Sequence, residues 1–170
     1  MHLRHPGLTP AMARMFYEAA SVCLSRHHSR PTMIKIDRAG TVIEAEVDWL
    51  PQSGQLEAAY ANTIDTTENG AYGMALAAAE LSAQLVAIQR AETLSGADYY
   101  LAPEGSSYDD LEEALRFEVS GTDLGTRSQC EGRLVTKIEQ TKAAKHSIPA
   151  LAGVVGFSHR LVLLSDEIAP

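Results

Sequence analysis

Two acidic residues lie inside segments whose other residues are typical of β-strands. Asp98 begins the run "DYYLA", and Glu118 lies in "LRFEVSG". A carboxylate buried in a strand without a partner is costly, so each acid must face solvent or share a countercharge. Two such carboxylates close together would repel each other unless a cation lay between them, and magnesium or manganese suits oxygen ligands of this kind. The alternative is a pair of surface acids on a half-exposed sheet face.

Strand alternation indicates which way the second acid points. In a strand, Phe117 and Val119 point to one face and Glu118 to the other. If the two segments pair as antiparallel neighbours, Asp98 and Glu118 lie at the same end of the pair. We therefore expect the two carboxylates to be able to point to one side of the sheet.

Hydrophobic periodicity and breaker residues predict the elements that must position these acids. Thr9 and Pro10 begin the first predicted helix, and the segment at 56–62 fits a short helix or an irregular crossing. The predicted helices span 10–27, 65–84 and 128–146. The predicted strands span 32–37, 41–50, 85–91, 97–102 and 114–121, with a last strand or bent pair within 153–166.

This order of elements predicts an α/β fold in a single domain, residues 1–170. The first two strands form a hairpin, which follows the first helix in an N-terminal extension, residues 1–64. Residues 65–165 form an αβββαβ core, because three strands in a row favour a meander and a later strand returns through a helical crossover. The expected architecture is a mixed β-sheet flanked by helices.

The central helix is expected to be largely buried, because its alanine-rich sequence is apolar on all sides. Asp65, Thr66 and Thr67 are residues that favour a helix start. This start places Glu68 and Gly70 in the first turn, where a glycine costs about 1 kcal/mol relative to alanine.

Composition limits the class of protein. The 170 residues suffice for one core, and the hydrophobic fraction of 45% and charged fraction of 21% are ordinary for a globular chain. Cys23 and Cys130 are far apart in sequence, which indicates neither a disulfide framework nor a thiolate zinc site. No signal peptide or membrane span is expected, so the predicted location is the cytoplasm.

Charge is distributed unevenly along the chain. The formal net charge is −8, but residues 1–40 hold six Lys or Arg against two acids and are +4, which leaves −12 for the rest. A basic N-terminal part could contact nucleic-acid phosphate or an acidic partner. The alternative is an ordinary solvated helix face.

The segments "TTENGAYGMAL", "SGADYYL", "LRFEVSG" and "RLVTKIEQTK", with their acids in this order, resemble the core of the PD-(D/E)XK nuclease superfamily over roughly residues 65–165. The resemblance implies that Asp98 is the first metal-binding acid, Glu118 the second and Glu68 a helix-borne acid of the same cluster. It also implies Mg²⁺ or Mn²⁺ as the cofactor and in-line hydrolysis of phosphodiester bonds in DNA or RNA.

One position departs from the pattern of that superfamily. The lysine expected two residues after the second acid is Ser120 here. A lysine on the following helix could replace it in space, and Lys137 is the best candidate because Arg133 and Gln140 share its face, with Lys142 as the second choice. The alternative is that Lys137 is an ordinary solvent-exposed lysine.

The sequence thus leads to the hypothesis of a metal-dependent nuclease that works in a complex. Nucleic acid would bind through the basic N-terminal part or a partner subunit, and a protein partner or a homo-oligomer is expected. Restriction, repair and mobile-element defence are the contexts that the resemblance implies. The alternative hypothesis is a catalytically degenerate subunit for binding or assembly, and an intermediate one is an oligomer whose site is completed by a second chain.

Overall fold

Seven strands form one mixed sheet in the computed structural model, which describes residues 1–93, 95–143 and 147–169. The strand order is β2-β1-β7-β6-β5-β4-β3. The strands are β1 (Thr32–Arg38), β2 (Thr41–Val47), β3 (Leu85–Arg90), β4 (Tyr99–Pro103), β5 (Leu115–Thr122), β6 (Ala150–Gly156) and β7 (Leu161–Leu164). The helices are α1 (Pro10–Ser25), α2 (Gly54–Ala59), α3 (Thr63–Ala83) and α4 (Arg127–Ala143).

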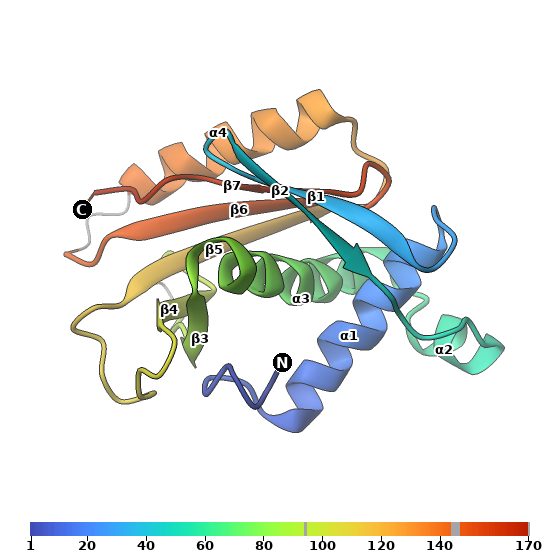
Figure 1. The fold of residues 1–170 in the computed structure, drawn as a ribbon, viewed down its shortest axis with the longest axis horizontal. Coiled ribbons are helices and arrows are strands. Elements are labelled where there is room, and N and C mark those ends of the chain that lie inside the picture. The colour runs from blue at the N-terminus through green and yellow to red at the C-terminus, as the bar shows by residue number, and fades with distance from the viewer. Residues whose placement is uncertain (94, 144–146, 170) are drawn as a thin grey trace.

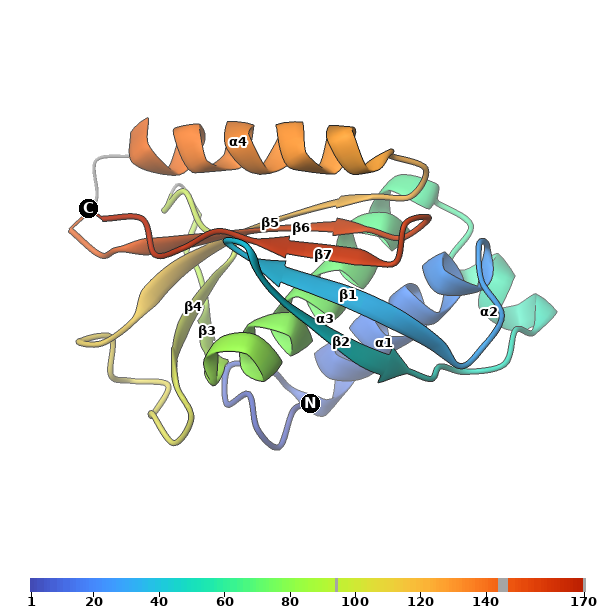
Figure 2. The same cartoon turned by 45° about the horizontal axis from the view of Figure 1, so that its top comes forward.

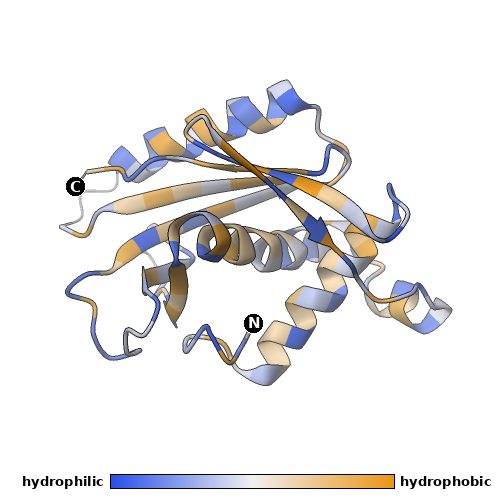
Figure 3. Cartoon of the chain, viewed as in Figure 1, coloured by the Kyte–Doolittle hydropathy of each residue, from blue (hydrophilic) through white to orange (hydrophobic). Residues whose placement is uncertain are grey.

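Helices cover the sheet on both faces (Figure 1). The helices α1 and α3 pack against each other on one face, and α4 lies across β5, β6 and β7 on the other, as the turned view in Figure 2 shows. Hydrophilic and hydrophobic residues alternate along α4, as expected for a helix with one solvated side (Figure 3). The predicted α/β class, in a single domain, is confirmed.

The core has the predicted αβββαβ order. After α3, strands β3, β4 and β5 pair as an antiparallel meander, and α4 then carries the chain across to β6, which pairs parallel with β5. The last predicted segment is the bent pair, because β6 and β7 are antiparallel neighbours. The predicted helix at 128–146 ends at Ala143, and residues 144–146 lie outside the described part of the chain.

The N-terminal hairpin belongs to the same sheet as the core. Strands β1 and β2 are antiparallel, and β1 pairs parallel with β7. The opposite edge is covered by the residues before α1, because the Gly7 amide donates to the Ala87 carbonyl at 2.9 Å and the Ala87 amide donates to His5 Nδ1 at 3.0 Å. One edge strand, β3, is therefore protected by the chain's own N-terminal segment.

The start of α3 was predicted wrongly. The helix begins at Thr63, because the side chain of Asn62 caps it by accepting from the amides of Ile64 and Asp65. Gly70 therefore lies beyond the first turn, where it lets α1 approach: a Cβ on it would lie 3.1 Å from the Cα of Ala20. Gly70 therefore allows α1 and α3 to pack closely, and it does not lie in the first turn of α3.

A second glycine sets the distance between α3 and β5. A Cβ on Gly121 would lie 2.7 Å from the Cβ of Ala71 and 2.9 Å from the carbonyl oxygen of Thr67. Only a residue without a side chain allows this approach. The first half of α3, which holds Glu68, is thereby held against the end of β5.

Candidate active site

The strands β4 and β5 separate just where the two predicted acids lie. Pairing between them runs only from Tyr99 opposite Phe117 to Leu101 opposite Leu115, so the second half of β5 extends beyond β4. A recess of about 500 Å³ opens there between α3, β5 and α4. Its lining includes Glu68 and Tyr72 from α3, Asp98, Glu118 and Ser120 from the strand ends, and Arg133 and Lys137 from α4.

Asp98 lies immediately before β4 and fastens it to β5. Its amide donates to the Phe117 carbonyl at 2.8 Å, and its Oδ2 accepts from the Val119 amide at 2.8 Å. The carboxylate thus supplies an acceptor to a strand edge that β4 no longer covers. This contact explains physically why an acid precedes the strand.

Glu118 points toward α4 and contacts Lys137. The Nζ of Lys137 lies 2.6 Å from Oε1 of Glu118, and both side chains are mostly buried, at 24% and 20% exposure. One helical turn earlier, Nη1 of Arg133 donates to the Ser120 hydroxyl at 3.4 Å. The helix therefore brings two cations to the polar face of β5, and one of them stands beside the second acid.

Glu68 is connected to Asp98 through a tyrosine. The hydroxyl of Tyr72 lies 2.9 Å from Oε1 of Glu68 and 2.9 Å from Oδ1 of Asp98. Nη2 of Arg90 donates to the same hydroxyl at 3.3 Å. Burial, followed by the charge of Asp98, raises the pKa of Tyr72 far above its usual value. The phenol therefore stays protonated and acts as a hydrogen-bond donor.

The acids form two groups within the one recess. Glu68 and Asp98 meet at Tyr72, whereas Glu118 is held by Lys137. Across residues 1–93, 95–143 and 147–169, no set of three or more His, Cys, Asp or Glu side chains is close enough to hold a metal ion. The donor chemistry still fits a hard cation, because Mg²⁺ is commonly bound by one or two carboxylates together with water and phosphate oxygens.

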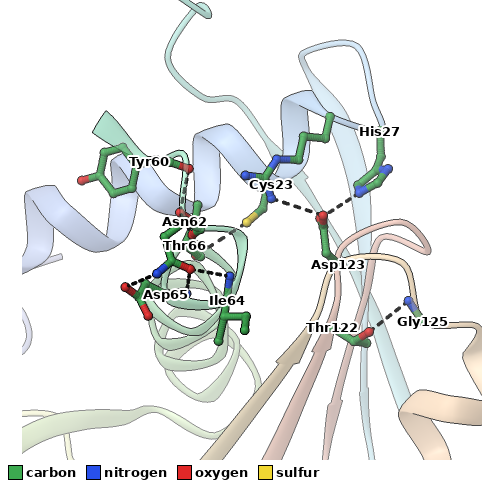
Figure 4. Close-up of polar contacts among 11 residues, drawn as sticks. Cys23, His27, Tyr60, Asn62, Ile64, Asp65, Thr66, Thr122, Asp123 and Gly125 are labelled. Carbon is green, nitrogen blue, oxygen red and sulfur yellow. Dashed lines mark hydrogen bonds and ion pairs between the residues drawn. The ribbon is translucent and has the colours of Figure 1, made fainter. Parts of the chain in front are cut away.

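A fourth acid, Asp123, also lines the recess and has partners of its own. Asp123 accepts from Nη1 of Arg26 at 3.2 Å and contacts Nε2 of His27 at 2.8 Å (Figure 4). The capped first turn of α3 lies nearby, around Asn62. Asp123 thus ties the end of α1 to the end of β5 at the rim.

The predicted basic N-terminal part is largely paired within the chain. Four of its bases contact carboxylates, namely Arg4 with Glu80, Arg14 with Glu18, Arg26 with Asp123 and Arg30 with Asp48. Lys35 and Arg38 form no ion pair with any residue that the structure describes. These contacts favour the interpretation of a solvated, internally neutralised surface over that of a phosphate-binding arm.

Sequence patterns did not single out Tyr72 or Arg90. A signal for Tyr72 was available, because it follows Glu68 by four residues and so lies on the same helix face. Arg90 offered none, since its neighbours depend on how β3 packs against α3.

Comparison of the chain with family models, with curated proteins and with solved structures gave no match. Among the described residues, no helix has both the length and the apolar composition needed to cross a membrane. The chemistry of the site must therefore be argued from its own residues.

Proposed function

We propose that this protein is a metal-dependent nuclease that hydrolyses phosphodiester bonds of DNA or RNA in the recess between α3, β5 and α4. The observation that carries the proposal is the 2.6 Å contact between Lys137 and Glu118, in a recess that Asp98 also lines. It supplies, from a helix, the lysine that the strand lacks at Ser120. Asp98, Glu118 and Lys137 are the proposed catalytic residues.

The acids of the recess have the donor atoms for Mg²⁺ or Mn²⁺. Asp98 and Glu118 would hold the ion, Glu68 would add a further oxygen from α3, and water and substrate phosphate would complete its shell. When bound, the ion would activate a water molecule and stabilise charge on the phosphate. Lys137 keeps the Glu118 side chain directed into the recess and adds positive charge beside it.

The charge balance suggests how substrate would reach this site. The chain is −8 overall, and most of its N-terminal bases are paired with carboxylates. An acidic protein repels a nucleic-acid backbone at long range. Substrate capture is therefore assigned to a partner subunit or a second copy of the chain, in the cytoplasm, with restriction, repair or defence as the context. Arg133, at the Ser120 hydroxyl, is the local group suited to a phosphate.

A cleavage assay with matched variants tests this function. Single- and double-stranded DNA and RNA are incubated with Mg²⁺ or Mn²⁺ and the wild-type chain, D98N, E118Q or K137M. We expect each substitution to lower the rate by roughly 10²-fold or more, as for loss of a group that acts in the transition state.

Two control variants carry the same chemical changes away from the recess. E131Q alters an acid on the exposed side of α4, and K142M alters the other candidate lysine, in the last turn of that helix. Both should retain the wild-type rate. Equal background cleavage by the wild type and all three recess variants would refute the nuclease function.

A binding or assembly subunit without hydrolysis is the second candidate. It is favoured by the contacts that already occupy Asp98, whose two oxygens are taken by Tyr72 and the Val119 amide. Ser120 in place of the strand lysine agrees with it. This candidate predicts that the wild type retains a labelled oligonucleotide or a protein partner without cleaving nucleic acid under any metal condition.

A further inference from the structure

Tyr72, Tyr99 and Arg90 pack together next to Asp98. The guanidinium of Arg90 lies 4.6 Å from the ring centre of Tyr72 and 4.7 Å from that of Tyr99. The two rings meet edge to face at 5.8 Å, and Phe16 from α1 packs against Tyr72 at 5.6 Å. Packing on several sides fixes the ring of Tyr72, and so fixes where its hydroxyl can be.

The hydroxyl of Tyr72 has more partners than it has hydrogens. It accepts from Arg90 and lies at hydrogen-bond distance from both Glu68 and Asp98. A phenol carries one hydrogen, so it can donate to only one carboxylate at a time. The two acids are thus drawn to a single point from different elements, Glu68 from α3 and Asp98 from the start of β4.

We propose that Tyr72 is a positioning residue that joins the helix acid Glu68 to the strand acid Asp98, with Arg90 holding its hydroxyl from behind. This inference rests on the proposed metal-dependent function. The hydroxyl brings two carboxylates from separate elements to within reach of one divalent cation. Groups that orient metal ligands typically change metal affinity by roughly ten- to a hundredfold when removed.

A purely structural role would leave metal binding unchanged, and this distinction gives the test. Affinity for Mn²⁺ is measured by titration calorimetry on the full chain, in the absence of substrate, for the wild type and Y72F. The substitution keeps the ring and its packing and removes only the hydroxyl. We expect Y72F to bind Mn²⁺ at least about tenfold more weakly.

The neighbouring tyrosine supplies a matched control. Tyr100 also has a hydroxyl bonded to a glutamate, at 3.2 Å from Oε2 of Glu92, but it packs in a different apolar cluster. Y100F should therefore lose a comparable hydrogen bond and keep the wild-type affinity for Mn²⁺.

The outcomes separate this inference from the function on which it rests. If the wild type binds Mn²⁺ and cleaves nucleic acid while folded Y72F has unchanged affinity, the positioning role is wrong and the nuclease function stands. If the wild type neither binds Mn²⁺ nor cleaves, both are wrong. Equal weakening in Y72F and Y100F would also refute the positioning role, because it would show a general effect of losing a buried hydroxyl.

Discussion

The two faces of β5 are both covered by helices, yet they differ in chemistry. On the α3 side, Phe117 is fully buried and Val119 nearly so, both within the main apolar core. On the α4 side the alternating residues are polar. Arg116 bonds backbone carbonyls, Glu118 bonds Lys137, and Ser120 accepts from Arg133.

This difference explains how a strand can carry an acid. The desolvation cost of a partly buried carboxylate is offset when the covering helix supplies a cation in contact with it. The α4 face has such partners and the α3 face does not. We therefore expect substitutions on the α3 face to act on stability, and substitutions on the α4 face to act mainly on the chemistry of the recess.

The largest expected effect comes from the apolar face. F117A removes a fully buried ring and should lower the free energy of unfolding by about 3–5 kcal/mol. S120A, on the polar face of the same strand, should change it by less than about 0.5 kcal/mol. Urea unfolding monitored by circular dichroism measures both. A similar loss in the two variants would show that the faces do not differ in their contribution to stability.

The close approach of α3 to β5 gives the second effect. G121A introduces a Cβ 2.7 Å from that of Ala71, which forces the helix and strand apart and should cost about 1–3 kcal/mol. On the solvent-exposed side of α4, a Cβ on Gly132 meets nothing within 4 Å. G132A should therefore stabilise the protein by up to about 1 kcal/mol, because alanine favours a helix over glycine. Destabilisation by G132A, or none by G121A, would contradict this account of the two glycines.

The fold was predictable from sequence to the extent that it depends on local patterns. Amphipathic periodicity predicted the helix before Pro31, and strand alternation predicted which face of β5 carries Glu118. The start of α3 was missed, because Asp65, Thr66 and Thr67 are all good caps in isolation. The cap that forms belongs to Asn62, while Thr66 and Thr67 are buried.

The candidate site was only partly predictable, because its contacts join distant elements. Asp98, Glu118 and Lys137 were selected by residue type and helix spacing, and all three line one recess. The division of the acids into a Tyr72 group and a Lys137 group could not be predicted. It depends on where β4 leaves β5 and on how closely Gly121 lets α3 approach.

The ion pair between Lys137 and Glu118, on the α4 side of β5, should make a small contribution to the free energy of unfolding. A double-mutant cycle with E118Q and K137M should give a coupling energy of about 1 kcal/mol, since both side chains are only partly exposed. Added salt should reduce the coupling little, because partly buried pairs are screened less than exposed ones. A coupling of zero would mean that Lys137 and Glu118 do not interact in solution. The polar face would then lack the countercharge that distinguishes it.

The smallest effect concerns His5, which is fully buried and contacts Glu80 of α3. Burial lowers the pKa of His5 below its usual value, although Glu80 opposes the shift, and Nδ1 accepts from the Ala87 amide and so must be unprotonated. Below about pH 6.5, His5 is protonated in the unfolded chain but stays neutral in the folded one. The free energy of unfolding should therefore fall as the pH drops below this value, and should stay constant above it. Melting temperatures between pH 8 and 5 measure the effect, and H5Q, which keeps an acceptor and a donor, should flatten the profile. An unchanged profile in H5Q would assign the acid sensitivity to other groups. The α3 side of the sheet would then differ from the α4 side in packing alone, because the burial of an uncharged His5 would not contribute to the pH dependence of stability.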